Sequence, residues 1–444
     1  MTAVDRFFEI SARGSTVGTE IRGGVVTFIA MAYIIVLNPI ILSGAADVVG
    51  HKLGFTQVSA VTALAAGVMT ILFGVVARLP FAFAAGLGIN SFLASSVVGS
   101  LTWPEAMGLV VINGLIIVAL AISGLRKLIF DAVPMPLKLA ITAGIGLFIL
   151  FIGLIDAGFV GSTGLPSPPL GLGAKGAGSI TTIPTLIFVL TLLVTGILVA
   201  RKVRGGILIG LIAGTVVAVV VEAVWHLGSA VDKPGGWSLS VPTLSGSPFA
   251  VPDLSLVGEF SLASFGRIGI LAGIMLVFTL VFTNFFDAMG TFTGLSRQAG
   301  LSDEHGNFPR LQSALVVEGA GAVVGGAVSA SSNTVFIESG TGIGEGARTG
   351  LASLVTGTLF LAAMFLTPLA AIVPSEVAAA ALVVVGALMA SVLRDIDFDD
   401  FSVTLPVVLT VAVMPLSYSI ANGIGVGFIA WVVLRSASGR AREI

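Results

Sequence analysis

Long apolar stretches, joined by short polar connections, run along almost the entire chain. Each stretch is continuous rather than alternating, so the pattern predicts helices that cross a membrane and not the strands of an outer-membrane barrel. Two stretches, 81–98 and 332–345, are short and rich in glycine, and each is expected to hold an extended piece followed by a half-helix. The predicted segments number about fourteen: 21–43, 57–79, 81–98, 105–124, 136–154, 182–200, 205–226, 267–295, 310–328, 332–345, 348–370, 374–392, 401–417 and 419–436.

The composition indicates an integral membrane protein. Of the 444 residues, 56% are hydrophobic and only 10% are charged, with a mean hydropathy of +1.10, whereas about a quarter of the residues in an average soluble domain are charged. The 57 glycines favour the closely packed or interrupted helices of a transporter or channel. The chain has no cysteine, which excludes disulfides and thiolate metal sites, and no basic tract that would indicate nucleic acid. The expected surroundings are a lipid bilayer, and no cofactor or metal is expected.

Positively charged residues predict the orientation of the chain. With the N-terminus in the cytoplasm, only four of the 21 Lys and Arg residues fall in outside segments: Lys52, Lys175, Lys233 and Arg267. Because Lys and Arg accumulate in cytoplasmic loops, both termini are predicted to be cytoplasmic in a multi-pass protein of the cell (plasma or inner) membrane. The charges before the first apolar stretch predict no signal peptide. The outside loops 155–181 and 227–266 are expected to be solvated connections. The acidic run 395–400 is expected to cap the next helix or to be solvated, rather than to bind calcium.

The two glycine-rich segments occupy matching places in two sets of seven spans. Residues 81–90 and 334–344 each combine a short apolar stretch with small residues and glycines. With seven spans in each set, the second copy must be inverted relative to the first. Paired interrupted segments in inverted repeats indicate the binding site of a transporter near the middle of the membrane.

Acidic residues within apolar segments are the main candidates for chemistry. Asp287 lies in the eighth segment, Glu318 in the ninth and Glu338 in the tenth. A carboxylate at membrane depth costs at least ~2.5 kcal/mol, and no Lys, Arg or His lies within these apolar interiors to neutralise it. Removal from water favours the protonated form, so these groups are candidates for proton exchange. Hydrogen bonding between helices is the alternative, and Gly319 and Gly321 leave room for Glu318 to bond a neighbouring backbone.

A polar pocket is expected where the two interrupted segments meet. Backbone N–H groups of the half-helices lie beside Glu338, and Asn90 offers both a donor and acceptors. Phe83 and Phe336 are candidates for flat walls against a planar ring, with ordinary packing as the alternative role. Such a pocket suits a neutral heterocycle with N–H donors and ring acceptors. Two carboxyls make it a poor site for an inorganic anion.

At these residues the chain resembles the nucleobase:cation symporter family of the xanthine/uracil permease superfamily, in its hypoxanthine–adenine–guanine permease branch. The resemblance covers nearly the whole chain, and its motifs are specific together rather than singly. They are Thr19-Glu-Ile-Arg-Gly-Gly, Met31-Ala-Tyr-Ile-Ile-Val-Leu-Asn-Pro39, Ala85-Gly-Leu-Gly-Ile-Asn90, Lys138-Leu-Ala-Ile-Thr-Ala-Gly-Ile-Gly146, Phe286-Asp-Ala-Met-Gly-Thr-Phe292, Phe336-Ile-Glu-Ser, Gly346-Ala-Arg-Thr-Gly350 and Met414-Pro-Leu-Ser-Tyr-Ser-Ile-Ala-Asn-Gly423.

The resemblance implies an all-α membrane fold of fourteen spans in two inverted repeats, with short antiparallel strands in segments 3 and 10. A core domain is expected to move against a gate domain in an elevator-like, alternating-access cycle that imports purine bases with protons as the coupling ion. A homodimer is left open. The expected boundaries are a cytoplasmic N-terminus 1–20, core halves 21–125 and 267–370, gate halves 126–226 and 371–436, an external loop 227–266, and a cytoplasmic C-terminus 437–444.

The resemblance also implies roles for individual residues. The family's binding carboxylates match Glu338 and Asp287, and its asparagine on the third segment matches Asn90. Ala84, Ile337 and Thr291 complete the expected substrate contacts beside Phe83 and Phe336, and Asp287, Glu338 and Glu318 are the expected proton-coupling groups. Two positions depart from the pattern: Asn284 stands where many members of the branch have aspartate, and Phe336 stands where tyrosine is usual.

Two other classes of function are weighed against a purine permease. An anion transporter of the sulfate or bicarbonate type has the same architecture, but its site needs positive character, which Glu338 and Asp287 oppose. An intramembrane protease of the aspartyl type needs a Gly-x-Gly-Asp motif, and a serine type needs a histidine in the membrane. The sequence has neither.

Overall fold

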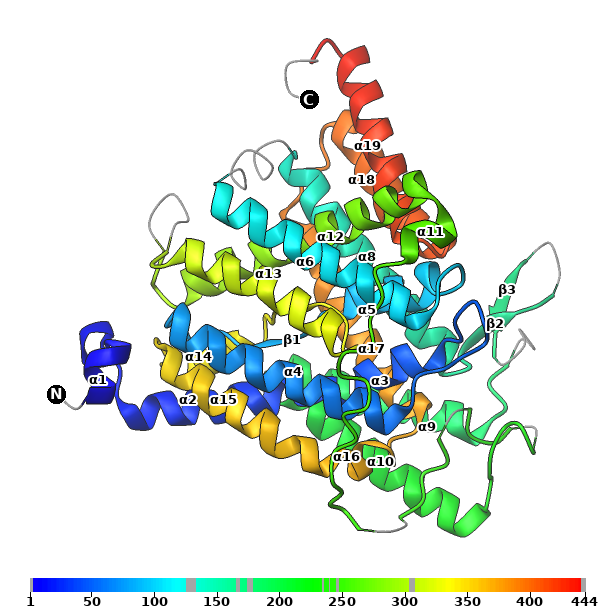
Figure 1. The fold of residues 1–444 in the computed structure, drawn as a ribbon. Helices are drawn as coiled ribbons and strands as arrows, with labels where there is room; N and C mark the ends of the chain where they lie inside the picture. Colours follow the sequence, from blue (N-terminus) through cyan, green and yellow to red (C-terminus); the bar gives the residue numbers. More distant parts are fainter. Residues whose placement is uncertain are drawn as a thin grey trace. The chain divides into compact units, whose positions relative to one another are not determined.

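The computed structural model describes residues 3–124, 133–164, 168–173, 179–233, 235–238, 240–244, 247–302 and 308–440, and they are mostly helical (Figure 1). Arg126, Lys127 and Lys175, which contribute to the predicted orientation, lie outside these residues. In the first half the elements are α1 (Ala3–Phe8), α2 (Val17–Met31), α3 (Ile34–Gly44), α4 (Phe55–Val76), β1 (Phe83–Ala85), α5 (Leu87–Phe92), a π-helical turn (Leu93–Val97), α6 (Trp103–Ser123), α8 (Met135–Asp156), β2 (Val160–Ser162), β3 (Leu170–Leu172), α9 (Ile183–Ala200) and α10 (Gly206–Trp225).

The second half repeats this alternation of long helices around one interrupted segment. Its elements are α11 (Ser264–Ile268), α12 (Ile270–Gln298), α13 (Leu311–Ala327), β4 (Asn333–Val335), α14 (Ser339–Gly344), α15 (Gly350–Ala363), α16 (Thr367–Ala370), α17 (Ser375–Ala390), α18 (Phe401–Leu416) and α19 (Ile420–Ala437). Short 3-10 turns cover Ser11–Arg13, Met364–Leu366 and Ser391–Asp395.

Ten helical segments among the described residues are long and apolar enough to cross a membrane. Shorter apolar helices cover Leu87–Val97, Leu311–Ala327 and Phe401–Leu416. The predicted segments therefore coincide with observed elements, whereas the number of fourteen spans is not established. The first segment differs from expectation because α2 and α3 are separated at Ala32 and Tyr33, where the helical hydrogen bonds tighten to i→i+3.

The chain divides into two compact units, and each contains residues from both halves of the sequence. Unit 1 comprises Met1–Arg126 and Ser247–Ala370, and unit 2 comprises Lys127–Gly246 and Ala371–Ile444. The unit boundaries near residues 126 and 370 lie where the core and gate boundaries are expected. The expected external loop 227–266, in contrast, is divided between the two units.

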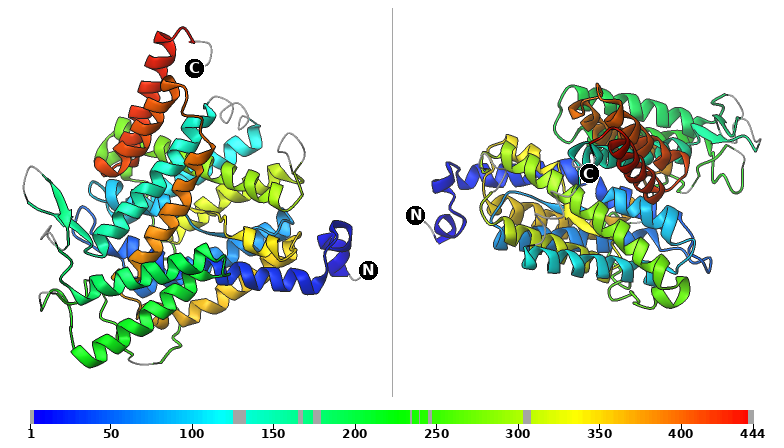
Figure 2. Two further views of the ribbon diagram at one scale, coloured as in Figure 1. Left: turned by 180° about the vertical axis from the view of Figure 1, so that it is seen from behind. Right: turned by 90° about the horizontal axis from the view of Figure 1, so that it is seen from above.

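Glycine pairs hold helices of the first half against helices of the second half. A Cβ atom added at Gly67 of α4 would lie 2.9 Å from the carbonyl oxygen of Gly357 in α15, so only glycine permits this approach. Equivalent pairs join α6 to α13 and α8 to α17, and Figure 2 shows α4 and α15 side by side from two further directions. The pairs are Gly67–Gly357, Gly74–Gly350, Gly114–Gly319 and Gly146–Gly386.

The predicted strands in segments 3 and 10 are confirmed. β1 pairs antiparallel with β4, and the register places Phe83 opposite Val335, Ala84 opposite Thr334 and Ala85 opposite Asn333. All six residues are buried. Two segments that are distant in the sequence are thereby fixed together in the interior of unit 1.

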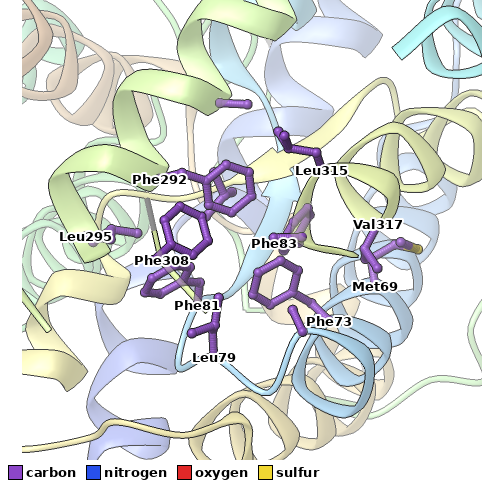
Figure 3. Packing of buried hydrophobic residues seen from close by; sticks show 14 of the residues in the cluster. Met69, Phe73, Leu79, Phe81, Phe83, Phe292, Leu295, Phe308, Leu315 and Val317 are labelled. Carbon is purple, nitrogen blue, oxygen red and sulfur yellow. The ribbon is translucent and has the colours of Figure 1, made fainter. Parts of the chain in front are cut away.

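An aromatic cluster anchors β1 from one side (Figure 3). The Phe83 ring lies 4.8 Å from that of Phe73, and the Phe73 ring lies 5.9 Å from that of Phe292, centroid to centroid. Phe81 and Phe308 complete the cluster. Buried aromatic area of this size is a large source of packing energy, and it keeps the short strand in place.

The two loops that are expected to lie outside are more ordered than plain solvated connections. The first contains the β2–β3 hairpin. In the second, the indole N–H of the fully buried Trp237 donates to Glu222 Oε2 at 2.8 Å, and the backbone N–H of Ser238 donates to Glu376 Oε1 at 2.9 Å. The prediction of a plain connection is therefore wrong around Trp237 and Ser238, which are held against helices of unit 2, whereas the β2–β3 hairpin is half-buried to exposed.

The acidic run before α18 caps that helix, as expected. Asp400 is its N-cap residue and accepts a hydrogen bond from the Ser402 backbone N–H at 2.9 Å. The Arg435 guanidinium also lies 3.2 Å from Asp400 Oδ2. The hydroxyl and backbone N–H of Ser402, together with the charge of Arg440, lower the pKa of Asp400 below its ordinary value.

The predicted orientation can be tested with single cysteines, because the chain contains none. Val251 is 90% exposed and lies in the expected external loop. Val251→Cys should react with a membrane-impermeant thiol reagent in intact cells. Ser438→Cys, near the C-terminus, should react only after the cells are permeabilised. The opposite labelling pattern would show that the chain has the inverse orientation in the membrane.

Candidate functional site

The candidate site lies where the paired strands give way to the half-helices of unit 1. β1 leads into α5, and β4 leads through Phe336 and Glu338 into α14. Beyond the strands, the Phe336 N–H donates to the Ala82 carbonyl, and the Ala82 N–H donates to Ser339 Oγ, both at 2.9 Å. These bonds extend the pairing as far as the first residue of α14, so the position of Glu338 is tightly defined.

Glu338 is the N-cap residue of α14 and is half-buried. Its Oε1 accepts a hydrogen bond from the hydroxyl of Tyr33, which stands at the interruption between α2 and α3. Among the described residues, no Lys, Arg or His forms an ion pair with this carboxyl. Besides the Tyr33 hydroxyl, the backbone N–H of Glu338 itself is the group among the described residues that favours the charged carboxyl, so Oε2 makes no bond to another described side chain.

Asp287 lies on α12 within a polar stripe. Thr283, Asn284 and Thr291 stand four residues before, three before and four after it, so the four share one helix face. The Asp287 carboxyl is half-buried, and its charge interacts with those of Glu338 and Glu318. Within the described part of the chain, neither amide atom of the fully buried Asn284 has a hydrogen-bond partner.

Glu318 supports a strand. It is only 1% exposed, and its Oε2 accepts the Val335 backbone N–H of β4 at 3.3 Å. α13 comes this close because it carries glycine: a Cβ atom at Gly321 would lie 2.8 Å from the Asn333 carbonyl oxygen. This is the backbone contact that the sequence left open as an alternative to proton coupling.

Asn90 is part of a buried amide network. Its Nδ2 donates to Asn38 Oδ1 at 2.6 Å, and Asn38 Nδ2 donates to Thr62 Oγ1 at 2.7 Å and to the Ala330 carbonyl at 3.1 Å. Asn90 Oδ1 has no partner among the described residues. Of the groups expected from Asn90, one N–H is used by Asn38, and the acceptor oxygen is left for a ligand.

The remaining expected contacts differ in accessibility. The Phe83 ring is fully covered within the aromatic cluster, so its role here is the packing alternative and not an open wall. Ala84 is also fully buried, and Phe336 is 8% exposed. Thr291 is half-buried, whereas Ile337 is 58% exposed.

Two residues of this neighbourhood, Tyr33 and Asn38, are absent from the residues expected from sequence. Both lie on the first segment, and each contacts one interrupted segment, Glu338 in the second half and Asn90 in the first. A polar Asn38 inside an apolar stretch is a signal that could have been used. Tyr33 gives a weaker signal because a tyrosine ring is compatible with ordinary packing.

Together these groups have the chemistry that a neutral polar solute would complement. The two carboxyls have no cationic partner in the described part of the chain. With a phenol and two amides they supply directional acceptors and donors at the junction of the half-helices. N–H groups of a ligand complement the free carboxylate oxygens through charge-assisted bonds. An anion meets repulsion from Asp287 and Glu338.

Comparison with known proteins gives a consistent picture. Residues 18–429 match the sequence profile described as "Permease family" (Xan_ur_permease). The guanine/hypoxanthine permease PbuG of Bacillus subtilis is 38% identical, over 99% of this chain and 95% of that protein. The adenine permease AdeP of Escherichia coli is 34% identical, over 99% and 92%.

Solved structures share the fold at low sequence identity. The transmembrane domain of a cyanobacterium bicarbonate transporter, BicA, superposes with a TM-score of 0.62 at 18% identity, covering 94% of this chain and 97% of that one. The murine anion transporter Slc26a9 in its inward-facing state also gives 0.62, at 10% identity, covering 95% and 68%. This likeness concerns the fold alone.

Proposed function

This chain belongs to the permease family matched above, and from that membership we propose that it imports purine nucleobases, namely adenine, guanine and hypoxanthine, together with protons. Full-length relatives named as guanine/hypoxanthine and adenine permeases support the choice of substrate. The observation that carries the proposal is the pair of uncompensated carboxyls, Glu338 and Asp287, beside the interrupted segments. One carboxyl binds a ligand N–H, and the other exchanges the proton.

The proposed cycle has two steps at these residues. Asp287 takes a proton from the outside, which removes one of two repelling charges and allows the loaded carrier to reorient. On the inner side it releases the proton, and the returning negative charge weakens the hold on the base. Unit 1 is the proposed moving core and unit 2 the proposed gate of an elevator-like, alternating-access mechanism.

The anion transporter remains the second candidate because the solved structures of the same fold include a bicarbonate transporter and an anion transporter. The charges at the site oppose it. A sulfate or bicarbonate beside Glu338 and Asp287 would bring like charges together in a weakly screened interior. Such repulsion costs on the order of several kcal/mol of binding free energy.

Competition for uptake tests the substrate class. Cells that lack their own purine permeases and express this protein should take up radiolabelled hypoxanthine, and excess unlabelled adenine, guanine or hypoxanthine should reduce that uptake. Uracil, nucleosides and sulfate should not compete, because a buried polar site rejects a ligand with mismatched hydrogen-bonding edges. Competition by sulfate without competition by purines would favour the anion transporter.

A further inference from the structure

The hydroxyl of Tyr33 reaches the candidate site from an unexpected element. Tyr33 stands at the interruption of the first apolar segment, where α2 ends at Met31 and α3 begins at Ile34. The side chain is only 1% exposed, and its hydroxyl donates to Glu338 Oε1. A buried hydroxyl is costly unless it is hydrogen-bonded, so this contact is a defined part of the site.

The contact divides the two oxygens of Glu338 between two tasks. We propose that Tyr33 is a positioning residue for substrate binding: its hydroxyl occupies Oε1 of Glu338 and thereby aims Oε2 at an N–H group of the substrate. The inference rests on the proposed function, because it assigns Glu338 to the base. Without the hydroxyl, the carboxylate is free to rotate about its last bond, and that freedom must be lost again when a base binds.

The first segment is well placed for this task because it contacts both interrupted segments. Tyr33 holds Glu338 beside α14, and five residues later Asn38 accepts a hydrogen bond from Asn90 in α5. Asn38 also donates to the Ala330 carbonyl, at 3.1 Å, just before β4. The short stretch from Tyr33 to Asn38 therefore fixes polar groups that both halves of the chain bring to the site.

Removal of the single hydroxyl oxygen of Tyr33 tests the inference. Tyr33→Phe keeps the ring and removes only the hydroxyl, and purified protein should bind hypoxanthine about three- to tenfold more weakly, because the freed Glu338 carboxylate must be ordered again when the base binds. The matched control is Tyr418→Phe, because the chain has only two tyrosines and Tyr418 belongs to unit 2. This control should bind hypoxanthine as the wild type does.

A double-mutant cycle separates positioning from a general effect on packing. If Tyr33 acts through Glu338, the double variant Tyr33→Phe/Glu338→Gln should bind no more weakly than Glu338→Gln alone. Two independent losses that multiply would overturn the inference. Unchanged affinity of Tyr33→Phe, in a protein whose wild type binds purines, would overturn it as well. A wild type that binds no purine would instead overturn the proposed function.

An infrared measurement reports the contact without any substrate. In the Tyr418→Phe background, ring-labelled tyrosine is incorporated only at Tyr33, and its C–O stretching band reports the hydrogen bond. The band should shift when Glu338 is replaced by Gln and should remain in place when Glu345, seven residues along the same segment, is replaced by Gln. A band that is indifferent to Glu338→Gln would contradict the contact.

Discussion

Glu338→Gln should bind purine bases 10- to 100-fold more weakly than the wild-type protein. The variant replaces a charge-assisted hydrogen bond with a neutral one, and a bond to a charged group contributes about 1.5–3 kcal/mol. The loss falls on the substrate because Tyr33 already occupies Oε1, so Oε2 is the oxygen that the base must use. Equilibrium binding of radiolabelled hypoxanthine to purified protein measures the effect directly.

Glu345→Gln is the matched control for this variant. Glu345 follows α14, and its Oε2 pairs with Arg22 at 3.0 Å, away from the paired strands. The same chemical change at that position should leave purine affinity unaltered. Equal affinities for the wild type and Glu338→Gln would exclude Glu338 as a ligand for the base.

Asp287→Asn should abolish accumulation of purines against a gradient while leaving binding and exchange measurable. An amide cannot release or take up a proton, so the variant behaves as a permanently protonated carrier. Asn284, one turn earlier, cannot replace the lost carboxyl, because its side chain is itself an amide. Proteoliposomes with an imposed pH gradient measure accumulation, and counterflow with internal unlabelled base measures exchange.

The two assays must give different answers for the coupling role to hold. Loss of both accumulation and exchange in Asp287→Asn would indicate a damaged site. Full pH-driven accumulation by this variant would exclude Asp287 as the group that couples transport to protons. Thr279→Val, two turns earlier in α12, removes a hydroxyl that donates to the Met275 carbonyl of the same helix at 3.0 Å, and this variant should retain coupled accumulation.

The apolar pattern predicts most of the fold because each segment must bury its own backbone polar groups in lipid. It fails at Ala32 and Tyr33, since a tightened turn inside an apolar stretch leaves hydrophobicity unchanged. Glu338 and Asp287 can be identified from sequence because a charge in such a stretch is costly. The role of Glu318 depends on the strand register, and the covering of Phe83 depends on which side of β1 faces the aromatic cluster. Both the register and the orientation of β1 depend on residues that are distant in the sequence, so a local sequence pattern does not predict them.

The glycine pairs also constrain how the protein is made. Gly67 and Gly74 of α4 have their partners at Gly357 and Gly350, which are 290 and 276 residues later in the chain. The ribosome therefore completes α4 long before it completes α15, the helix that α4 packs against. During that interval the glycine-lined face of α4 is exposed to lipid or to the chaperones and proteases of the membrane. Synthesis of the second half then closes both units almost together, since each is built from both halves. Two polypeptides divided within 227–266 should therefore each be unstable alone and stable when produced in the same cell.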